Sequence, residues 1–181
     1  MHIVTDRLLI RDFRPGDRGD LYEILGDEDT MKFSEPPYDL EKTEKFLMDF
    51  CIGQGRAVAA ALRESGKVIG YILFSQYGMK VYEMGWFFHR AYRGQGYAAE
   101  SCRAVAEYAF REMAVHKIFA ETINPSGSES LLRKLGMGLE GVQRSQCQDL
   151  EGRWVDLYLY GRVANMSEDC IGNLTTPSRS N

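Results

Sequence analysis

A basic, glycine-bearing turn followed at once by a long amphipathic segment is the most chemically informative part of this 181-residue chain. Gly94 and Gly96 carry no side chains, so the backbone around them can curl and aim successive N–H groups at one point. The helix expected after them adds the positive end of its dipole, and Arg93 and Arg90 add formal positive charge. We therefore expect a phosphate or pyrophosphate to bind here.

Other interpretations of the same glycines remain open. Gly94-x-Gly96-x-x-Ala99 also matches the fingerprint of dinucleotide-binding folds, with Glu121 at about the spacing for a ribose contact. In those folds the first glycine follows its strand directly, whereas residues 90–93 intervene here. The glycine and lysine pattern of a P-loop is absent from the sequence. A connection that binds no ligand is the remaining alternative.

Composition limits the classes of function. Apolar residues make up 44% of the chain and charged residues 27%, which is typical of one soluble globular domain. The formal net charge of −4 provides no electrostatic footprint for nucleic acid, and no apolar run approaches the ~20 residues of a membrane span. Isolated cysteines and the lack of a signal-peptide pattern lead us to expect a cytoplasmic protein with no metal site.

Hydrophobic periodicity predicts a mixed α+β arrangement in one domain over residues 1–163. Strands are expected over residues 3–13, 58–63, 68–74, 81–89, 117–123, 141–147 and 154–163, and helices over residues 17–25, 39–52, 97–113 and 128–135. Several strands follow one another in hairpin fashion, which argues against regular alternation of parallel strands and helices. The polar stretch 164–181 is expected to be a loose tail.

Several segments carry a family resemblance. The turn reads Arg93-Gly94-Gln95-Gly96-Tyr97-Ala98, and it resembles the Gln/Arg-x-x-Gly-x-Gly/Ala turn of the GNAT superfamily of N-acetyltransferases. Residues 5–11, 84–88 and 128–137 resemble, in order, the opening strand, the fourth strand and a later helix of the RimJ/RimL-type ribosomal-protein N-acetyltransferase branch. The resemblance implies the GNAT fold, with a mixed, mostly antiparallel sheet of about seven strands flanked by about four helices.

The resemblance also implies a reaction, in which an amine attacks the thioester of acetyl-CoA directly. The turn would bind the cofactor's pyrophosphate. The backbone of Trp86, Phe87 and Phe88 would pair with the pantetheine arm like an added strand, and an N–H group there would polarise the thioester carbonyl. The side chains of these aromatic residues are equally compatible with the hydrophobic core.

Ser128 is, by the same resemblance, the first choice for the proton donor to the leaving thiolate, with Tyr158 as a second choice. Ser128 could equally be a helix N-cap. The family usually places an Asn three residues before this Ser, whereas Asn124 lies four residues before it. Asn124 is therefore a candidate cofactor contact whose role is left open.

The attacking amine must be neutral, and Glu83 is the candidate base. It lies in an apolar strand expected at the centre of the sheet, and strand alternation places it on the same face as Gly85 and Phe87, towards the expected amine entry. Burial would raise the pKa of this carboxyl and make it a better base, acting directly or through water. An exposed structural carboxylate is the alternative, and Glu121 on the neighbouring strand is a weaker candidate for the base.

The acceptor is expected to be a peptide or small-molecule amine. An N-terminal α-amine, with a pKa near 7.7–8.0, costs only about 1 kcal/mol to deprotonate at pH 7, against roughly 4.6 kcal/mol for a lysine amine. A protein N-terminal α-amine is therefore preferred. A polyamine, an aminoglycoside or a metabolite is the alternative, and a non-catalytic acyl-CoA sensor is an alternative of another class. No nucleic-acid or membrane partner is expected, and edge-strand pairing would allow a homodimer.

Overall fold

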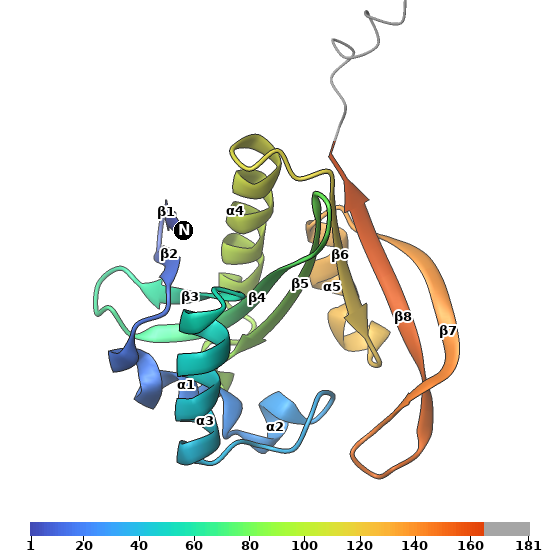
Figure 1. The fold of residues 1–181 in the computed structure, drawn as a ribbon, viewed down its shortest axis with the longest axis horizontal. Helices are drawn as coiled ribbons and strands as arrows, with labels where there is room; N and C mark the ends of the chain where they lie inside the picture. Colours follow the sequence, from blue (N-terminus) through green and yellow to red (C-terminus); the bar gives the residue numbers. More distant parts are fainter. Residues whose placement is uncertain (165–181) are drawn as a thin grey trace, which may run out of the picture.

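The computed structural model describes residues 1–164, which form one eight-stranded sheet with helices on both faces (Figure 1). The strands are β1 (His2–Val4), β2 (Leu8–Asp12), β3 (Ala57–Leu62), β4 (Val68–Gly78), β5 (Val81–Phe88), β6 (Lys117–Thr122), β7 (Gly138–Gln148) and β8 (Trp154–Val163). The helices are α1 (Arg18–Leu25), α2 (Glu28–Met31), α3 (Leu40–Phe46), α4 (Tyr97–Arg111) and α5 (Pro125–Lys134). The predicted mixed, mostly antiparallel sheet is confirmed.

The sheet divides at its centre. The strand order is β1-β2-β3-β4-β5-β6-β8-β7, and β5 and β6 are its one parallel pair within residues 1–164. They pair only from Val81 to Glu83 on β5 and from Lys117 to Phe119 on β6. Beyond this point β5 stays paired with β4 as far as Phe88, while β6 pairs with β8. The two halves of the sheet therefore separate and leave an opening between them.

Apolar side chains on the two faces of the sheet form two cores. Met84 and Phe88 of β5 face α4, where they pack in one cluster with Cys102 and Val105. Phe87 points to the other face and packs against the cluster formed with α1 and α3. This alternation follows from the two-residue period of a strand. Both faces of β5 are thus held by core packing, which fixes the direction of its backbone.

The beginning of the chain differs from the prediction of one strand over residues 3–13. The chain instead forms a hairpin in which Ile3 pairs with Ile10. The Thr5 N–H donates to the Leu8 carbonyl, and the Thr5 hydroxyl accepts from the Leu8 N–H. The Thr5 side chain closes this turn in place of the glycine or proline that usually marks a turn in a sequence. The sequence therefore contains no signal that the strand is interrupted here.

The helices differ from the sequence-based expectation in three ways. The helix expected over residues 39–52 changes to π-helical geometry from Leu47 to Gly53. Asp17 precedes α1, at a position where the sequence favours a side-chain helix cap, but its carboxylate instead accepts two hydrogen bonds from Arg11. The short helix α2 was not predicted, since four residues are too few to show periodicity. The predicted tail, apart from Ala164, lies outside the described residues, and the homodimer through an edge strand stays a prediction.

A glycine on β4 makes room for the last aromatic side chain of β5. A Cβ atom added to Gly70 would overlap the ring of Phe88. We expect Gly70→Ala to lower the free energy of unfolding by about 1–3 kcal/mol, the usual cost of overpacking a core. Gly19→Ala in α1 is the matched control, because nothing lies within 4 Å of its added Cβ, and it should stabilise the protein by about 0.4–1 kcal/mol. Urea denaturation measures the free energy of unfolding of both variants, and an equal change in the two would contradict the prediction.

Candidate active site

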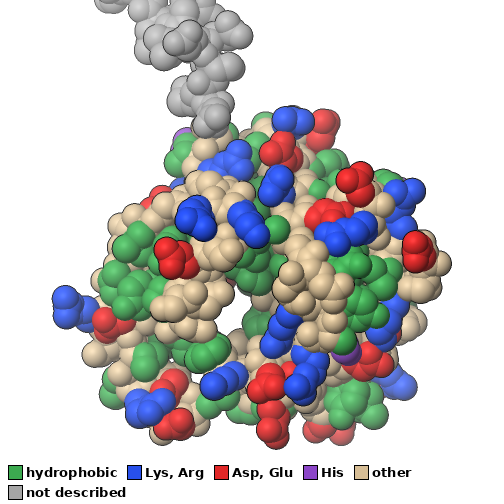
Figure 2. Space-filling view, turned by 180° about the vertical axis from the view of Figure 1, so that it is seen from behind, with side chains coloured by type: hydrophobic (Ala, Val, Ile, Leu, Met, Phe, Trp, Pro, Cys, Tyr) green, Lys and Arg blue, Asp and Glu red, His purple; other side chains and the backbone are tan. Residues whose placement is uncertain are grey.

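The opening in the sheet contains a cavity of about 570 Å³. It is lined by the end of β5, the glycine turn, the start of α4, the end of β6, and residues of α2 and α5. The space-filling view shows the hollow near the middle of the rear face (Figure 2). Predicted site residues that line it are Trp86, Phe87, Phe88, Arg93, Gly94, Gly96, Tyr97, Ala98, Asn124 and Ser128. Gln95, Glu83 and Tyr158 are not among the lining residues.

One edge of β5 faces the cavity without a partner strand. The His89 N–H donates to the Ile69 carbonyl in continuation of the β4–β5 ladder. Alternate residues of a strand point their backbone groups to the same side, so the N–H groups of Trp86 and Phe88, which lie beyond the last β5–β6 pair, face away from β4 and into the opening. A ligand with an extended chain of amides could pair with this edge as a strand would.

The glycine turn presents a second set of free donors. Gly94 and Gly96 have φ values of +75° and +83°, a backbone region that favours glycine. Within residues 1–164 the backbone N–H groups from Gly94 to Ala98 have no hydrogen-bond acceptor. They lie at the N-terminus of α4, a 15-residue helix whose dipole adds positive potential. The turn therefore has the features of an anion site.

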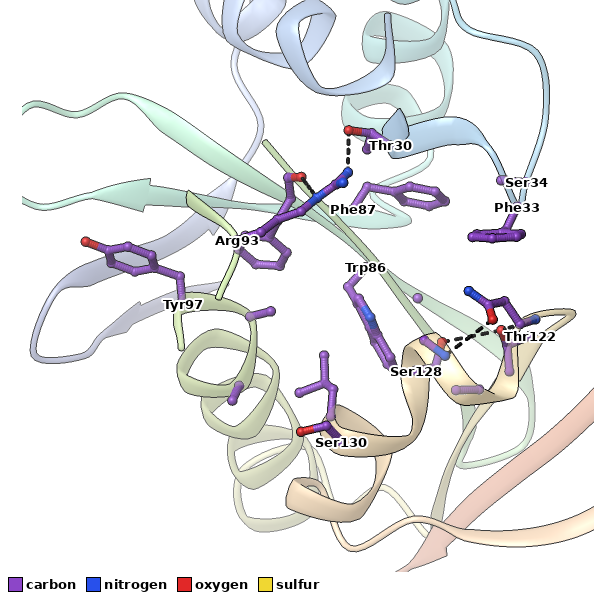
Figure 3. A pocket seen from close by; sticks show the side chains of 18 of the residues that line it. Thr30, Phe33, Ser34, Trp86, Phe87, Arg93, Tyr97, Thr122, Ser128 and Ser130 are labelled. Atoms are coloured by element: carbon purple, nitrogen blue, oxygen red, sulfur yellow. Dashed lines mark hydrogen bonds between the residues drawn. The ribbon is translucent and has the colours of Figure 1, made fainter. Parts of the chain in front are cut away.

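The two arginines before the turn do different things. The Arg93 Nε donates to the Phe88 carbonyl at 3.2 Å, and its Nη2 donates to the Thr30 hydroxyl at 2.6 Å (Figure 3). Arg93 thus ties the end of β5 to α2 at the edge of the cavity. Arg90 differs from the prediction, because its guanidinium faces Asp27 and Asp29 at 3.5 Å instead of the cavity. Its charge is compensated there by the two carboxylates.

Glu83 lies at the last residue pair of the β5–β6 ladder, directly before the opening. It is half-buried and shares its face with Phe87, as predicted, and not with Met84. Burial and, to a smaller extent, the charge of Glu121 raise the pKa of the Glu83 carboxyl above its usual value. Glu121 itself is exposed and lines the cavity. The two carboxylates therefore occur as a pair, with Glu83 the one held in the less polar surroundings.

Ser128 differs from the helix-capping alternative. The N-cap of α5 is Asn124, whose Oδ1 accepts from the Gly127 N–H at 3.3 Å, and Pro125 is the first helical residue. Proline is favoured at that position because its missing N–H has no partner there anyway. The Ser128 hydroxyl is therefore free of the cap and lies 3.4 Å from the Thr122 hydroxyl at the cavity wall (Figure 3).

Sequence reasoning missed the side of the cavity formed by α2 and the residues after it. Thr30, Phe33 and Ser34 lie across the opening from Ser128 and Thr122 (Figure 3). The Phe33 side chain is half exposed, which leaves its ring available to a ligand. Nothing in the local pattern of these residues indicates this position, because only the packing of α2 near β5 creates it.

Comparison with known proteins agrees with this arrangement. A family model described as an acetyltransferase (GNAT) domain matches residues 7–138. The chain belongs to the GNAT acetyltransferase family. It is 36% identical over 164 residues to YnaD of Bacillus subtilis, described as an uncharacterized N-acetyltransferase, in a match that covers 88% of this chain and 95% of that protein. GNAT acetyltransferases use acetyl-CoA, so the chain is an acetyl-CoA-dependent acyltransferase.

Solved GNAT structures confirm the fold. A GNAT-family acetyltransferase from Bacillus anthracis superposes with a TM-score of 0.83 at 31% identity, covering 91% of this chain and 99% of that one. RimL in complex with CoA superposes with a TM-score of 0.78, covering 91% of this chain and 98% of that one. Spermidine N-acetyltransferase from Vibrio cholerae with CoA and spermine superposes with a TM-score of 0.76, covering 88% of this chain and 97% of that one. Both are 17% identical and show similarity of fold alone. The RimJ/RimL branch therefore stays a prediction. None of the helices within residues 1–164 is long and apolar enough to span a membrane.

Proposed function

We propose that this GNAT enzyme transfers the acetyl group of acetyl-CoA to a primary amine, with a protein N-terminal α-amine as the preferred acceptor. The observation that carries the proposal is the placement of two sets of free backbone donors along one cavity. The turn from Gly94 to Ala98 supplies one set, and the open edge of β5 supplies the other. A ligand with a pyrophosphate at one end and an amide-containing arm at the other matches both sets.

In this proposal the pyrophosphate lies on the turn, and the pantetheine arm runs along Trp86 to the split in the sheet. The thioester then lies beside the open edge of β5, where a backbone N–H can stabilise the oxyanion that forms on attack. Ser128 lines the cavity, and its hydroxyl contacts the Thr122 hydroxyl at 3.4 Å, where either oxygen can be the donor; a hydroxyl that accepts from Thr122 fits a donor to the leaving thiolate. Asn124 uses its Oδ1 as a helix cap, so its Nδ2 is the group left for the cofactor.

Glu83 accepts the proton of the amine in the proposed reaction. Its raised pKa makes it a stronger base than an ordinary glutamate. One carboxylate is adequate for an α-amine, which costs only about 1 kcal/mol to deprotonate at pH 7. The neighbouring Glu121 favours the second candidate, a small cationic amine such as a polyamine, because two carboxylates on one face attract a multiply charged substrate.

The test is release of CoA thiol from acetyl-CoA by the purified protein with a panel of amines. The panel contains N-terminal peptides, the same peptides with a blocked α-amine and a free lysine, polyamines and aminoglycosides. We expect turnover with the free α-amine peptides and none with the blocked ones. Turnover restricted to polyamines would replace the preferred acceptor by the second candidate. Acetyl-CoA bound in calorimetry without any turnover would contradict both acceptor classes, and no binding would contradict the cofactor site.

A further inference from the structure

The turn between β1 and β2 reaches across the molecule to the glycine turn. The Arg7 Nη1 donates to the Gln95 carbonyl at 3.0 Å, and the Arg7 Nε donates to Glu100 at 2.7 Å. The same guanidinium lies 4.1 Å from the centre of the Tyr97 ring, in cation–π contact. Thr5 adds a hydrogen bond from its hydroxyl to the Glu100 carboxylate at 2.6 Å. One arginine therefore contacts three residues of the turn and of the first turn of α4.

The hydrogen bond from Arg7 to the Gln95 carbonyl determines the direction of the Gly96 N–H. In a planar trans peptide the C=O and the following N–H point in opposite directions. Since the Gln95 carbonyl points at Arg7, the N–H of Gly96 points away from Arg7. Gly96 lines the cavity, and its φ of +83° allows other orientations at little cost, because glycine populates many backbone regions. The contact with Arg7 thus selects one of several directions for this N–H.

Arg7 also compensates a charge that opposes anion binding. Glu100 lies in the first turn of α4, at the end where the proposed pyrophosphate binds. Burial acts to raise the pKa of its carboxyl, but the hydrogen bonds from Thr5 and Arg7 and the charge of Arg7 outweigh this and lower it, so Glu100 is ionised at neutral pH. Without Arg7 this carboxylate would place an unpaired negative charge beside the turn.

We propose that Arg7 is a positioning residue for the cofactor's pyrophosphate, which orients the Gln95–Gly96 peptide and neutralises Glu100. The proposal rests on the proposed function, because it presumes that the turn binds the pyrophosphate. Arg7 is not among the residues that line the cavity, so we expect no contact between Arg7 and the reacting atoms. Its effect therefore falls on cofactor binding and leaves the chemical step unchanged.

The experiment compares two ligands and measures both binding and turnover. Acetyl-CoA carries the pyrophosphate, and S-acetylpantetheine carries the same thioester arm without it. For Arg7→Ala we expect Kd and KM for acetyl-CoA to rise about ten-fold, with kcat unchanged. This is the usual effect of losing one hydrogen bond to a charged group, here the bond from the Gly96 N–H to the pyrophosphate. The variant should bind S-acetylpantetheine as well as the wild type does. Arg7→Lys keeps the positive charge but lacks the planar guanidinium, so its Kd for acetyl-CoA should rise less than that of Arg7→Ala.

Arg63 provides the matched control. Its Nη1 donates to the carbonyls of Thr5 and Asp6, so it holds the same β1–β2 turn without touching the glycine turn. Arg63→Ala should change the Kd for acetyl-CoA by less than about two-fold. Because Glu100 repels the cofactor once Arg7 is gone, the double variant Arg7→Ala/Glu100→Ala should bind acetyl-CoA more tightly than Arg7→Ala alone.

Two failures can be told apart. Equal affinity of the wild type for the two ligands would contradict the pyrophosphate site and with it the proposed function. If the wild type prefers acetyl-CoA but Arg7→Ala weakens both ligands alike, or Arg63→Ala has the same effect as Arg7→Ala, Arg7 merely supports the fold and the inference is overturned. Unchanged binding of acetyl-CoA by Arg7→Ala would overturn it as well.

Discussion

Glu83→Gln is expected to lower kcat about 100-fold, at the lower end of the range for a lost general base, because an α-amine needs little help to deprotonate. The same change should raise the melting temperature. Since the folded-state pKa of Glu83 is raised, the folded protein binds more protons than the unfolded chain between the two pKa values. Stability therefore falls as the pH rises through that window, and the ionised carboxylate destabilises the protein at neutral pH. Steady-state kinetics and thermal denaturation at pH 7.5 measure the two effects.

Glu121→Gln is the matched control for this prediction. Burial is the main cause of the raised pKa of Glu83, and the charge of Glu121 is the second. Removing that charge should lower the pKa of Glu83 in part, so the acid limb of the kcat profile moves to lower pH while kcat at its plateau is kept. Loss of activity in Glu121→Gln with full activity in Glu83→Gln would assign the base to Glu121 instead.

Gly94→Val is expected to weaken acetyl-CoA binding by at least about 100-fold. In the proposed function the turn offers several backbone donors to the pyrophosphate, and losing two hydrogen bonds to a charged group costs about 3 kcal/mol. Valine cannot adopt the φ of +75° without strain, so the turn must change shape, and the new side chain would also enter the proposed anion site. Calorimetric titration with acetyl-CoA measures the loss.

Gly66→Val separates this binding effect from the strain. Gly66 has a φ of +76° and, like Gly94, nothing within 4 Å of an added Cβ, but it lies between β3 and β4 and does not line the cavity. Both variants should lose about 1–3 kcal/mol of stability through backbone strain. Only Gly94→Val should lose the cofactor, and an equal loss of affinity in Gly66→Val would show that strain alone explains it.

The parts of the site that lie within one short segment could be predicted from sequence. Gly94 and Gly96 are recognisable because the turn needs residues without side chains, and the helix after it is long enough to show its period. The aromatic strand before them is recognisable by its apolar run. In the structure these segments line one cavity.

The parts that depend on long-range packing could not be predicted. Arg7 meets the glycine turn only through the hairpin of β1 and β2, and the separation of 88 residues from Gln95 leaves no local pattern. Thr30 and Phe33 belong to a helix too short for periodicity. The start of α5 is a different case. Asn124 and Pro125 are a recognisable helix start in the sequence, but the family resemblance led to the prediction that the helix begins at Ser128.

The narrow join between the halves of the sheet has a consequence for the free energy of the empty protein. Three residue pairs connect β5 to β6, and beyond them one edge of β5 has no neighbouring strand. In the proposed function the pantetheine arm pairs with this edge and acts as a removable ninth strand. Cofactor binding then also joins the two halves of the sheet, so tighter binding makes the sheet more stable. The exchange rate of the Trp86 backbone N–H should fall when the cofactor binds, and it reports both effects.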